Sequence, residues 1–409
     1  MRIDPNQHGW MILPETKAVM AALVDARFVG GAVRNALLGA PVSDVDIAVP
    51  MPPAESMARL AAAGIKTVPT GIDHGTITAV VGPHAFEVTS LRRDVDTDGR
   101  HAVIAFTDDW AEDAARRDFT INALYAGPDG EIFDYATGVE DLIAGRVRFM
   151  GDPAARIAED YLRILRLFRF HAWYGRGEID EPALRAAAAA RDHLAGLSAE
   201  RVAKEMLRLL EAPRPGPVVR VMAATGILPA LLPGALDLAR LERLCELDLE
   251  NKLAAEPVLR LASLLSRLEA EIAAARLKLS NADRSRLAQA LEEGDRIASH
   301  LKAPDVRRLL YTLGPAAFKD RVRLNWAAAP RSQPALAWRI LLAMADAYER
   351  PRFPLSGRDV MAAGVPEGAG VGKLLSRLER EWAEGDFIAD EAGLREKLAG
   401  LIAAGAWKD

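Results

Sequence analysis

The chain has 409 residues, enough for about two to four structural units, and half of them are hydrophobic, so a sizeable core is available. The net charge of −5 argues against a protein that wraps nucleic acid over its whole surface, and the single cysteine, Cys245, excludes a disulfide framework. No apolar run is long enough to span a membrane, and the opening MRIDPNQHGWMILP is unlike a signal peptide. We therefore expect a cytoplasmic protein without membrane segments, in which any RNA binding uses local basic patches.

The first predicted elements lead into a glycine-rich turn. A short apolar run at 28–29 predicts the first strand, and Gly30 and Gly31 follow it at once. Glycines allow the backbone to approach a ligand closely, and a helix over 32–38 would offer free N–H groups to phosphates. Arg34 lies in the first turn of this helix, where a guanidinium can bind a pair of phosphate oxygens.

Two aspartates follow at a spacing that suits a metal ion. The run DVDIAV, which begins at Asp44, has the composition of a buried strand, and on a strand Asp44 and Asp46 point to the same face. Two neighbouring carboxylates repel unless a cation lies between them, and their hard oxygens favour Mg²⁺. An Asp-x-Asp alone is more often a solvated turn. Here it follows a strand, a glycine pair and a helix, and we predict a magnesium site.

The stretch over 28–49, FVGGAVRNALLGAPVSDVDIAV, resembles the first motif of the class II tRNA nucleotidyltransferases and bacterial poly(A) polymerases, in the DNA polymerase beta superfamily. The family usually has Gly-Gly-x-Val-Arg-Asp-x-Leu-Leu-Gly followed by Asp-x-Asp. Position 35 is Asn35 here instead of the usual aspartate, while both later carboxylates are kept. The resemblance implies a nucleotidyltransferase head with two Mg²⁺ ions on Asp44 and Asp46. The residues of this motif expected to bind the nucleotide are Gly30, Gly31 and Arg34.

The next strands carry a third carboxylate. A β-branched run predicts a strand over 76–81, and AFEVTSLR predicts another over 85–92. Glu87 lies in the middle of the second strand among apolar neighbours, where an unpaired carboxylate is costly. A salt bridge to an arginine is one explanation. The family layout implies another, which we favour: a third catalytic carboxylate beside Asp44 and Asp46.

Residues 93–109, RDVDTDGRHAVIAFTDD, lose clean periodicity and gain charge, so we expect a disordered or functional loop. In the family this region is the flexible loop that CCA-adding enzymes keep and CC-adding relatives lack. Its presence points to an enzyme able to add the terminal A. The His-Gly-Thr at 74–76 is common in class II CCA-adding enzymes, and the basic signature of gamma-proteobacterial poly(A) polymerases is missing from that region.

The run RRDFTINAL, which begins at Arg116, closely matches the second motif of the family. The resemblance implies that Arg117 pairs with the triphosphate, while Asp118 and Asn122 read ribose hydroxyls. A charged helix face is the ordinary explanation for Arg-Arg-Asp, but the order of the motifs disfavours it. FDYATGVEDL, over 133–142, resembles the third motif, a turn region that joins head and neck.

Strand signals vanish after residue 150, and a helix is predicted over 156–173. It is apolar over a wide surface yet carries charged residues, which is compatible with a structural ion-pair network. The functional interpretation is better, because Glu159-Asp160-x-x-Arg163 matches the family's amino-acid template. We expect Asp160 and Arg163, as neighbours on the helix, to present one acceptor and one donor fork to the same pocket.

This pair suits two of the four bases. Cytosine and adenine place an exocyclic amine beside a ring-nitrogen acceptor, whereas guanine and uracil place a carbonyl where the amine would be. A carboxylate with a guanidinium therefore accepts C and A and leaves G and U with unpaired buried groups. Arg166 and Arg169 continue along the helix and would bind phosphates or hold Asp160.

Only helices are expected in the rest of the chain. LSAERV, over 197–202, resembles the fifth motif, a scaffold for the template helix, with Ser198 as a plausible N-cap. The tail over 354–375 resembles the region that holds the tRNA elbow. A group of basic residues would touch RNA backbone or form a solvated helix face, with no preference between the two: Arg307, Arg308, Lys319, Arg321 and Arg323.

We therefore predict an α+β protein with a mixed-sheet head. Its parts are a catalytic head (1–150), a helical neck with the nucleotide-selecting helix (151–225), a helical body (226–340) and a helical tail that contacts tRNA (341–409). The predicted function is template-independent addition of CCA to tRNA 3′ ends from CTP and ATP, with release of pyrophosphate. The alternatives are a poly(A) polymerase, a partial CC- or A-adding enzyme and, in another class, a catalytically silent RNA-binding protein, against which the intact aspartate pair argues.

Overall fold

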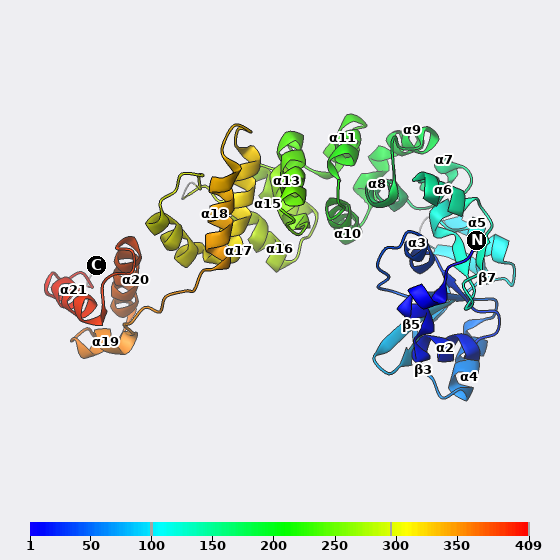
Figure 1. The fold of residues 1–409 in the computed structure, drawn as a ribbon, viewed down its shortest axis with the longest axis horizontal. Coiled ribbons are helices and arrows are strands. Elements are labelled where there is room, and N and C mark those ends of the chain that lie inside the picture. Colours follow the sequence, from blue (N-terminus) through cyan, green and yellow to red (C-terminus); the bar gives the residue numbers. More distant parts are fainter. Residues whose placement is uncertain (99–100, 295–296, 408–409) are drawn as a thin grey trace. The chain divides into compact units, whose positions relative to one another are not determined.

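The computed structural model describes residues 1–98, 101–294 and 297–407 (Figure 1). Contacts divide the chain into two compact units, Met1–Pro233 and Gly234–Asp409. The expected division into head, neck, body and tail is finer than this and stays a prediction. None of the helices in the described ranges combines the length and apolarity that a bilayer crossing requires.

A seven-stranded mixed sheet forms the centre of the first unit, as predicted for an α+β head. Its strand order is β3-β4-β5-β2-β1-β8-β9. All neighbours are antiparallel except β2 and β5, which run parallel and place Asp46 directly beside Glu87. The strands are β1 (Arg27–Val29), β2 (Asp46–Val49), β3 (Lys66–Gly71), β4 (Thr76–Val81), β5 (His84–Ser90), β8 (Leu124–Ala126) and β9 (Ile132–Asp134).

The loop predicted over residues 93–109 is not present in the described part of this region. Most of them belong to an antiparallel two-stranded sheet formed by β6 (Arg92–Asp98) and β7 (His101–Phe106), while residues 99–100 lie outside the described part of the chain. A register shift between Asp94 and Asp96 interrupts the alternation by which a strand is identified. For this reason the sequence pattern did not indicate the two strands.

Several helices of the head contact strands of this sheet. The fully buried side chains of Phe28, Ile47 and Tyr125, on three different strands, show that the sheet contributes the core of this part. The head helices are α1 (Gly9–Ile12), α2 (Pro14–Ala22), α3 (Gly31–Leu37), α4 (Pro53–Ala62), α5 (Trp110–Ala115) and α6 (Gly138–Ala144).

The rest of the first unit is helical, as expected. The helix predicted over 156–173 is broken, because Asp160 adopts extended backbone (φ −155°, ψ 106°) between two helices. The longer half, α8, packs against α10. Ser198 occupies the N-cap position of α10 without a side-chain cap bond. The helices are α7 (Pro153–Glu159), α8 (Leu162–Tyr174), α9 (Glu181–Ala189), α10 (Ala199–Leu210), α11 (Gly216–Ala224) and α12 (Ile227–Leu231).

Every described element of the second unit is a helix. Two separate helices, α14 and α15, follow each other here, because Ser266 and Glu269 form a capping box that starts α15. Gly314 and Pro315 kink α17. The helices are α13 (Leu238–Glu250), α14 (Pro257–Leu264), α15 (Arg267–Arg276), α16 (Asn281–Ala290), α17 (Ala303–Ala328), α18 (Ala335–Asp346), α19 (Gly357–Ala362), α20 (Ala369–Glu384) and α21 (Glu391–Ala403).

The basic residues of this unit that were considered for RNA contact have acidic partners within the chain. Arg321 and Arg323 are buried, and Arg321 lies 3.1 Å from Glu292. Lys319 pairs with Asp346 at 2.9 Å. For the two buried arginines neither expectation holds, since they are not on a solvated face and are not accessible to RNA.

Candidate active site

A pocket of about 730 Å³ in the first unit collects most of the residues singled out in the sequence. It is built from α3, the segment before β2, the Arg116–Asn122 motif, α8 and α10. Glu87 is the one predicted site residue that does not line it. The predicted residues that do are Gly30, Gly31, Arg34, Asp44, Asp46, Arg117, Asp118, Asn122, Asp160, Arg163, Arg166 and Arg169.

The glycine turn brings the backbone close to the second motif. Gly30 has a φ of 65° and a ψ of −118°, and its N–H donates to the carbonyl of Leu124 at 3.0 Å. A Cβ at this position would lie 3.6 Å from the carbonyl oxygen of Asn122 and 3.7 Å from Nη1 of Arg117. The positive φ, more than crowding, therefore requires glycine here.

Arg34 is buried, with 6 % of its surface exposed, and it reaches across to α8. Its Nη2 donates to the hydroxyl of Tyr174 at 2.8 Å and to Oδ1 of Asn35 at 3.0 Å. Its Nη1 donates to Oδ1 of Asn122. Burial lowers the pKa of the guanidinium, although an arginine remains charged at any physiological pH.

The three acidic residues are less alike than the sequence suggested. Asp46 begins β2, but Asp44 lies before the strand and is exposed. The prediction that the two aspartates share one face of a strand is therefore wrong. Glu87 is also exposed, which removes the desolvation argument made for it from the sequence. It nevertheless stands in register with Asp46 on the neighbouring strand.

The electrostatics of Asp46 single it out. Its pKa is raised to about 6, first by burial and then by the negative charges of Glu87 and Asp44, with Arg117 opposing them. Two further carboxylates thus act on Asp46, and the positive charge of Arg117 does not offset them. A divalent cation would relieve this repulsion, and hard carboxylate oxygens suit Mg²⁺. The residues therefore fit the metal that the family implies.

The expected metal-ligand set consists of two residues, Asp44 and Asp46. Within residues 1–98, 101–294 and 297–407, no cluster of three or more histidine, cysteine, aspartate or glutamate side chains has the arrangement of a metal site. The fit described above rests on charge and ligand type.

A residue that sequence reasoning missed holds the arginines of the second motif. Asp113 on α5 is 1 % exposed and binds Arg116 Nε at 2.8 Å and Arg117 Nη2 at 3.0 Å. It also accepts a hydrogen bond of 2.7 Å from the hydroxyl of Tyr125. The two arginines keep the pKa of the Asp113 carboxyl below its usual value despite burial. Asp113 therefore fixes Arg117 at the pocket wall.

Asp118 and Asn122, expected to read ribose hydroxyls, have partners within the protein. Asp118 accepts from Arg166 Nε at 2.7 Å and from Asn122 Nδ2 at 3.0 Å. The positive charge of Arg166 lowers the pKa of the buried Asp118 carboxyl. Both residues line the pocket, so a ligand would contact a preorganised network that joins the second motif to α8.

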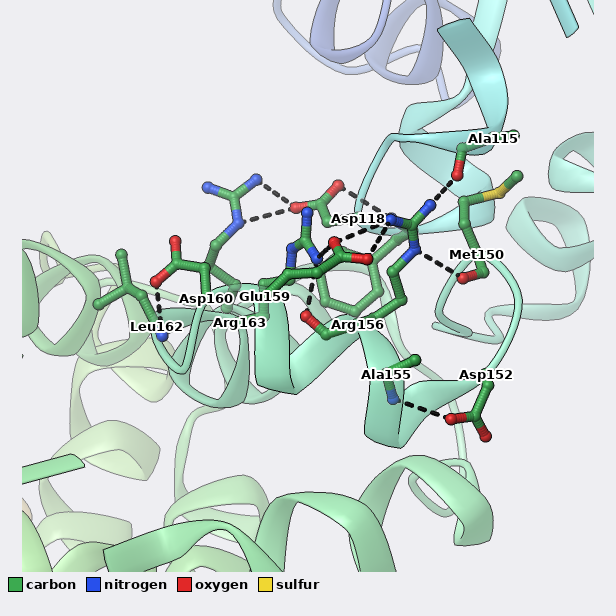
Figure 2. A network of polar contacts seen from close by, with 12 residues as sticks. Ala115, Asp118, Met150, Asp152, Ala155, Arg156, Glu159, Asp160, Leu162 and Arg163 are labelled. Atoms are coloured by element: carbon green, nitrogen blue, oxygen red, sulfur yellow. Dashed lines mark hydrogen bonds and ion pairs between the residues drawn. The ribbon is translucent and has the colours of Figure 1, made fainter. Parts of the chain in front are cut away.

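The expected pairing of Asp160 with Arg163 is not formed. Figure 2 shows Glu159 between Arg156 and Arg163, and Glu159 Oε2 lies 2.8 Å from Arg156 Nη1. Asp160 instead accepts from the N–H of Leu162 at 3.1 Å and from Arg201 Nη2 at 2.6 Å. The break in the helix at Asp160 causes this, because it removes the helical spacing on which the expectation rested.

Helix α10 supplies further partners. Glu205 is buried and pairs with Arg169 at 2.7 Å, so Arg169 does not hold Asp160. Arg201 and Arg208, on the same helix, line the pocket. None of these contacts was predicted, since LSAERV indicated a scaffold but not which arginines it would serve. The scaffold role itself agrees with the packing of α10 against α8.

Comparisons with known families cover both the head and the helices that follow. The model described as "Poly A polymerase head domain" matches residues 26–148. The model described as "Probable RNA and SrmB- binding site of polymerase A" matches residues 178–238. The first match contains the glycine turn, the aspartate pair and the second motif.

Curated relatives extend over most of the chain. CCA tRNA nucleotidyltransferase 1, mitochondrial, of Mus musculus is 34% identical over 372 residues, which cover 89% of this chain and 84% of that protein. The human protein of the same name is 34% identical with the same coverages. The CCA-adding enzyme of Lacticaseibacillus paracasei is 41% identical over 218 residues, 51% of this chain and 52% of that enzyme.

Solved structures share the fold over nearly the whole length. The Bacillus stearothermophilus CCA-adding enzyme in complex with CTP has a TM-score of 0.74 and 25% identity, over 97% of this chain and 100% of that one. The Thermotoga maritima CCA-adding enzyme complexed with tRNA shows the same fold at 20% identity, with a TM-score of 0.64, over 98% of this chain and 97% of that one. The chain belongs to the CCA tRNA nucleotidyltransferases, within the class II CCA-adding enzyme and poly(A) polymerase family.

Proposed function

We propose that this protein adds the CCA end to tRNA, using CTP and ATP and releasing pyrophosphate, without a nucleic-acid template. The observation that carries the proposal is the pocket itself, which is lined by the aspartate pair, by Arg34 and Arg117, and by the selecting residues at and after the break between α7 and α8. Relatives that carry the CCA-adding name match nearly the full chain. A small-molecule substrate would not require the helices that complete this pocket.

The reaction joins the tRNA 3′ end to the nucleotide in one step. The 3′-hydroxyl oxygen forms a bond to the α-phosphorus, the bond from that phosphorus to the bridging oxygen of the β-phosphate breaks, and the hydroxyl proton is lost. Arg34 and Arg117 face the triphosphate and stabilise its charge, aided by the close backbone at Gly30 and Gly31. Asp113 keeps Arg117 oriented while this happens.

Asp44 and Asp46 would hold Mg²⁺, with Glu87 as the third carboxylate beside them. The bound ions would neutralise charge on the attacking and leaving oxygens. The protein's own contribution is to keep these carboxylates close together, against their mutual repulsion, before any ligand enters.

Base selection falls to the start of α8. Asp160 presents an acceptor and Arg163 a donor fork, each oriented by a separate partner, Arg201 and Glu159. Because Asp160 and Arg163 are not bonded to each other, each can meet its own group on the same edge of the base. Cytosine and adenine satisfy both groups, whereas guanine and uracil turn a carbonyl towards the Asp160 carboxylate and an N–H towards the Arg163 guanidinium, so neither group is satisfied.

Asp118, Asn122, Arg166 and Arg169 complete the nucleotide site. Their network joins the second motif to α8, so the ribose and the base are read by connected groups. The expected cytoplasmic location stays a prediction, since relatives from mouse and human carry a mitochondrial name.

The experiment is single-nucleotide extension of three tRNA transcripts, ending at the discriminator base, at C and at CC. Each receives CTP, ATP or both with Mg²⁺. We expect two C residues from CTP, then one A and a stop. Long A tracts on any RNA end would make the protein a poly(A) polymerase, and a product that stops at CC, or grows only from CC, would make it a partial enzyme.

A further inference from the structure

Arg156 on α7 uses every nitrogen of its guanidinium, as Figure 2 shows. Its Nε donates to the carbonyl of Met150 at 3.0 Å, and its Nη2 donates to the carbonyl of Ala115. Its Nη1 lies 2.9 Å and 2.8 Å from the two carboxylate oxygens of Glu159. The side chain is 13 % exposed and does not line the pocket. Arg156 can therefore act on a bound nucleotide only through its neighbours.

The two carbonyl partners belong to the part of the site that faces the triphosphate. Ala115 ends α5 and directly precedes the second motif, which contains Arg117. The N–H of Met150 donates to the carbonyl of Asp118, in the same motif, at 3.0 Å. A guanidinium suits such a contact, because its planar fork can bond several oxygens at once. Arg156 is therefore bound at two points to the segment that carries Arg117.

The third partner of Arg156 leads to the base-reading group. Glu159 also accepts a hydrogen bond from Nη1 of Arg163, which donates in addition to the backbone carbonyl of Arg156 at 2.7 Å. Because the helix is broken at Asp160, Arg163 belongs to α8 while both of these partners belong to α7. Contacts of its side chain, rather than one continuous helix, therefore join Arg163 to α7.

We propose that Arg156 is a positioning residue: through Glu159, it holds Arg163 at a set distance from Arg117. The inference rests on the proposed function, in which one nucleotide is bound by Arg117 at the triphosphate and by Arg163 at the base. Both contacts form together only if the spacing of the two arginines matches the ligand. A wrong base is rejected only while Arg163 is unable to shift and avoid the N–H that faces it. Arg156 therefore contributes to base selection without touching the base.

The test measures kcat/KM of the full-length protein for single-nucleotide extension. CTP is compared with UTP on tRNA ending at the discriminator base, and ATP with GTP on tRNA ending at CC. Arg156→Met removes the guanidinium, whereas Arg156→Lys keeps a positive charge for Glu159 but cannot bond both carbonyls as well. A smaller folded fraction lowers kcat/KM for right and wrong nucleotides alike, so each ratio reports base selection and not stability.

We expect Arg156→Met to lower both ratios by about tenfold and Arg156→Lys to lower them by about fivefold or more. Because Arg156 acts through Glu159, adding Arg156→Met to Glu159→Gln should lower them by less than twofold further. Arg148→Met is the matched control, since Arg148 lies in the same unit, pairs with the buried Asp141 at 2.8 Å and does not line the pocket. It should reduce thermal stability and leave both ratios within twofold of wild type.

The role of Arg156 would be overturned by ratios within twofold of wild type in Arg156→Met, by full recovery in Arg156→Lys, or by an equal loss in Arg148→Met. Losses that multiply in the double variant would also overturn it, because Glu159 would then not be the link. A wild-type protein that adds only A would contradict CCA addition, but its ratio of ATP to GTP would still test Arg156.

Discussion

Asp46 in the first unit and Asp248 in the second are both aspartates whose pKa is raised by burial, but their neighbours differ. Asp248 is 2 % exposed and lies between Arg323 and Arg260, 3.2 Å from the latter, and both arginines lower its pKa again. Beside Asp46 the nearest charges include two more carboxylates, which raise its pKa further.

The difference distinguishes a charged residue that stabilises the fold from one that serves the reaction. The fold supplies Asp248 with its counterions, so nothing from outside is needed and the cluster stabilises the helices around it. The fold leaves Asp46 with an excess of negative charge, which costs stability and which a bound cation, or a proton at low pH, would relieve. A buried carboxylate that lacks counterions within the fold is therefore a better marker of the reaction site than a buried carboxylate that has them.

The largest effect should come from Asp46→Asn. We expect nucleotide transfer to fall at least about 1,000-fold, because metal stabilisation of the reacting oxygens contributes several kcal/mol. Binding of tRNA should stay within about twofold. Extension of end-labelled tRNA and a filter-binding titration measure the two quantities, with Glu55→Gln, at an exposed pair with Arg59, as the control.

The same substitution should stabilise the metal-free protein. A carboxyl pKa raised from 3.8 to about 6 means that the folded state disfavours the charged form above pH 6, by at most about 3 kcal/mol. The penalty is absent below pH 3.8 and fully present above pH 6, so the gain in Tm of Asp46→Asn should appear at pH 8 and shrink towards pH 4. An equal or lower Tm at pH 8 would mean that Asp46 is already balanced.

Asp248→Ala should behave in the opposite way. Removing the carboxylate of a buried ion cluster takes away an acceptor shared by Arg260 and Arg323, and the free energy of unfolding should fall by about 3–5 kcal/mol. Activity per folded molecule should remain within about twofold. Urea unfolding measures the change, and Asp346→Ala, at an exposed pair with Lys319, should cost less than about 1 kcal/mol. Similar losses in both variants would contradict the structural role.

Asp160→Ala tests the selecting residues with a smaller effect. Loss of the acceptor should reduce discrimination of CTP and ATP against UTP and GTP by about 10- to 100-fold. Misincorporation on tRNA ending at C measures it, with Asp192→Ala, at an exposed aspartate of the same unit, as the control. Unchanged selectivity in Asp160→Ala would remove Asp160 from the template.

The smallest effect concerns Cys245, which lies near the Asp248 cluster. Burial raises the pKa of its thiol to about 11, so about 0.1 % would be thiolate at pH 8. Labelling by a disulfide reagent should be slow, should speed up about tenfold per pH unit, and should be faster in Asp248→Ala because the unit opens more often. Rapid labelling of the native wild-type protein would show that the cluster is open.

Much of the site could be predicted from the sequence because its residues lie in short, ordered motifs. The glycine turn, the aspartate pair and the Arg117 motif meet in one pocket as expected, and β4 has the predicted bounds. These features depend on local backbone preference and on spacing, which a single chain displays directly.

The remainder depends on contacts between distant segments. Asp113 and Glu205 are ordinary acidic residues in their helices, and only the folded chain shows that they hold Arg117 and Arg169. The break at Asp160 could not be read from a continuous apolar pattern. The exposure of Glu87 was also missed, because apolar neighbours along a strand do not show which face is covered.

The most direct test of the proposed metal site counts the divalent ions that bind at the carboxylates around Asp46. Mn²⁺ binding in the presence of CTP, followed by electron paramagnetic resonance, should show about two ions per wild-type molecule. Asp46→Asn should lose at least one of them, and Asp248→Ala should lose none at a temperature where it is folded. Equal Mn²⁺ binding by wild type and Asp46→Asn would contradict the claim that the excess negative charge at Asp46 marks the metal site.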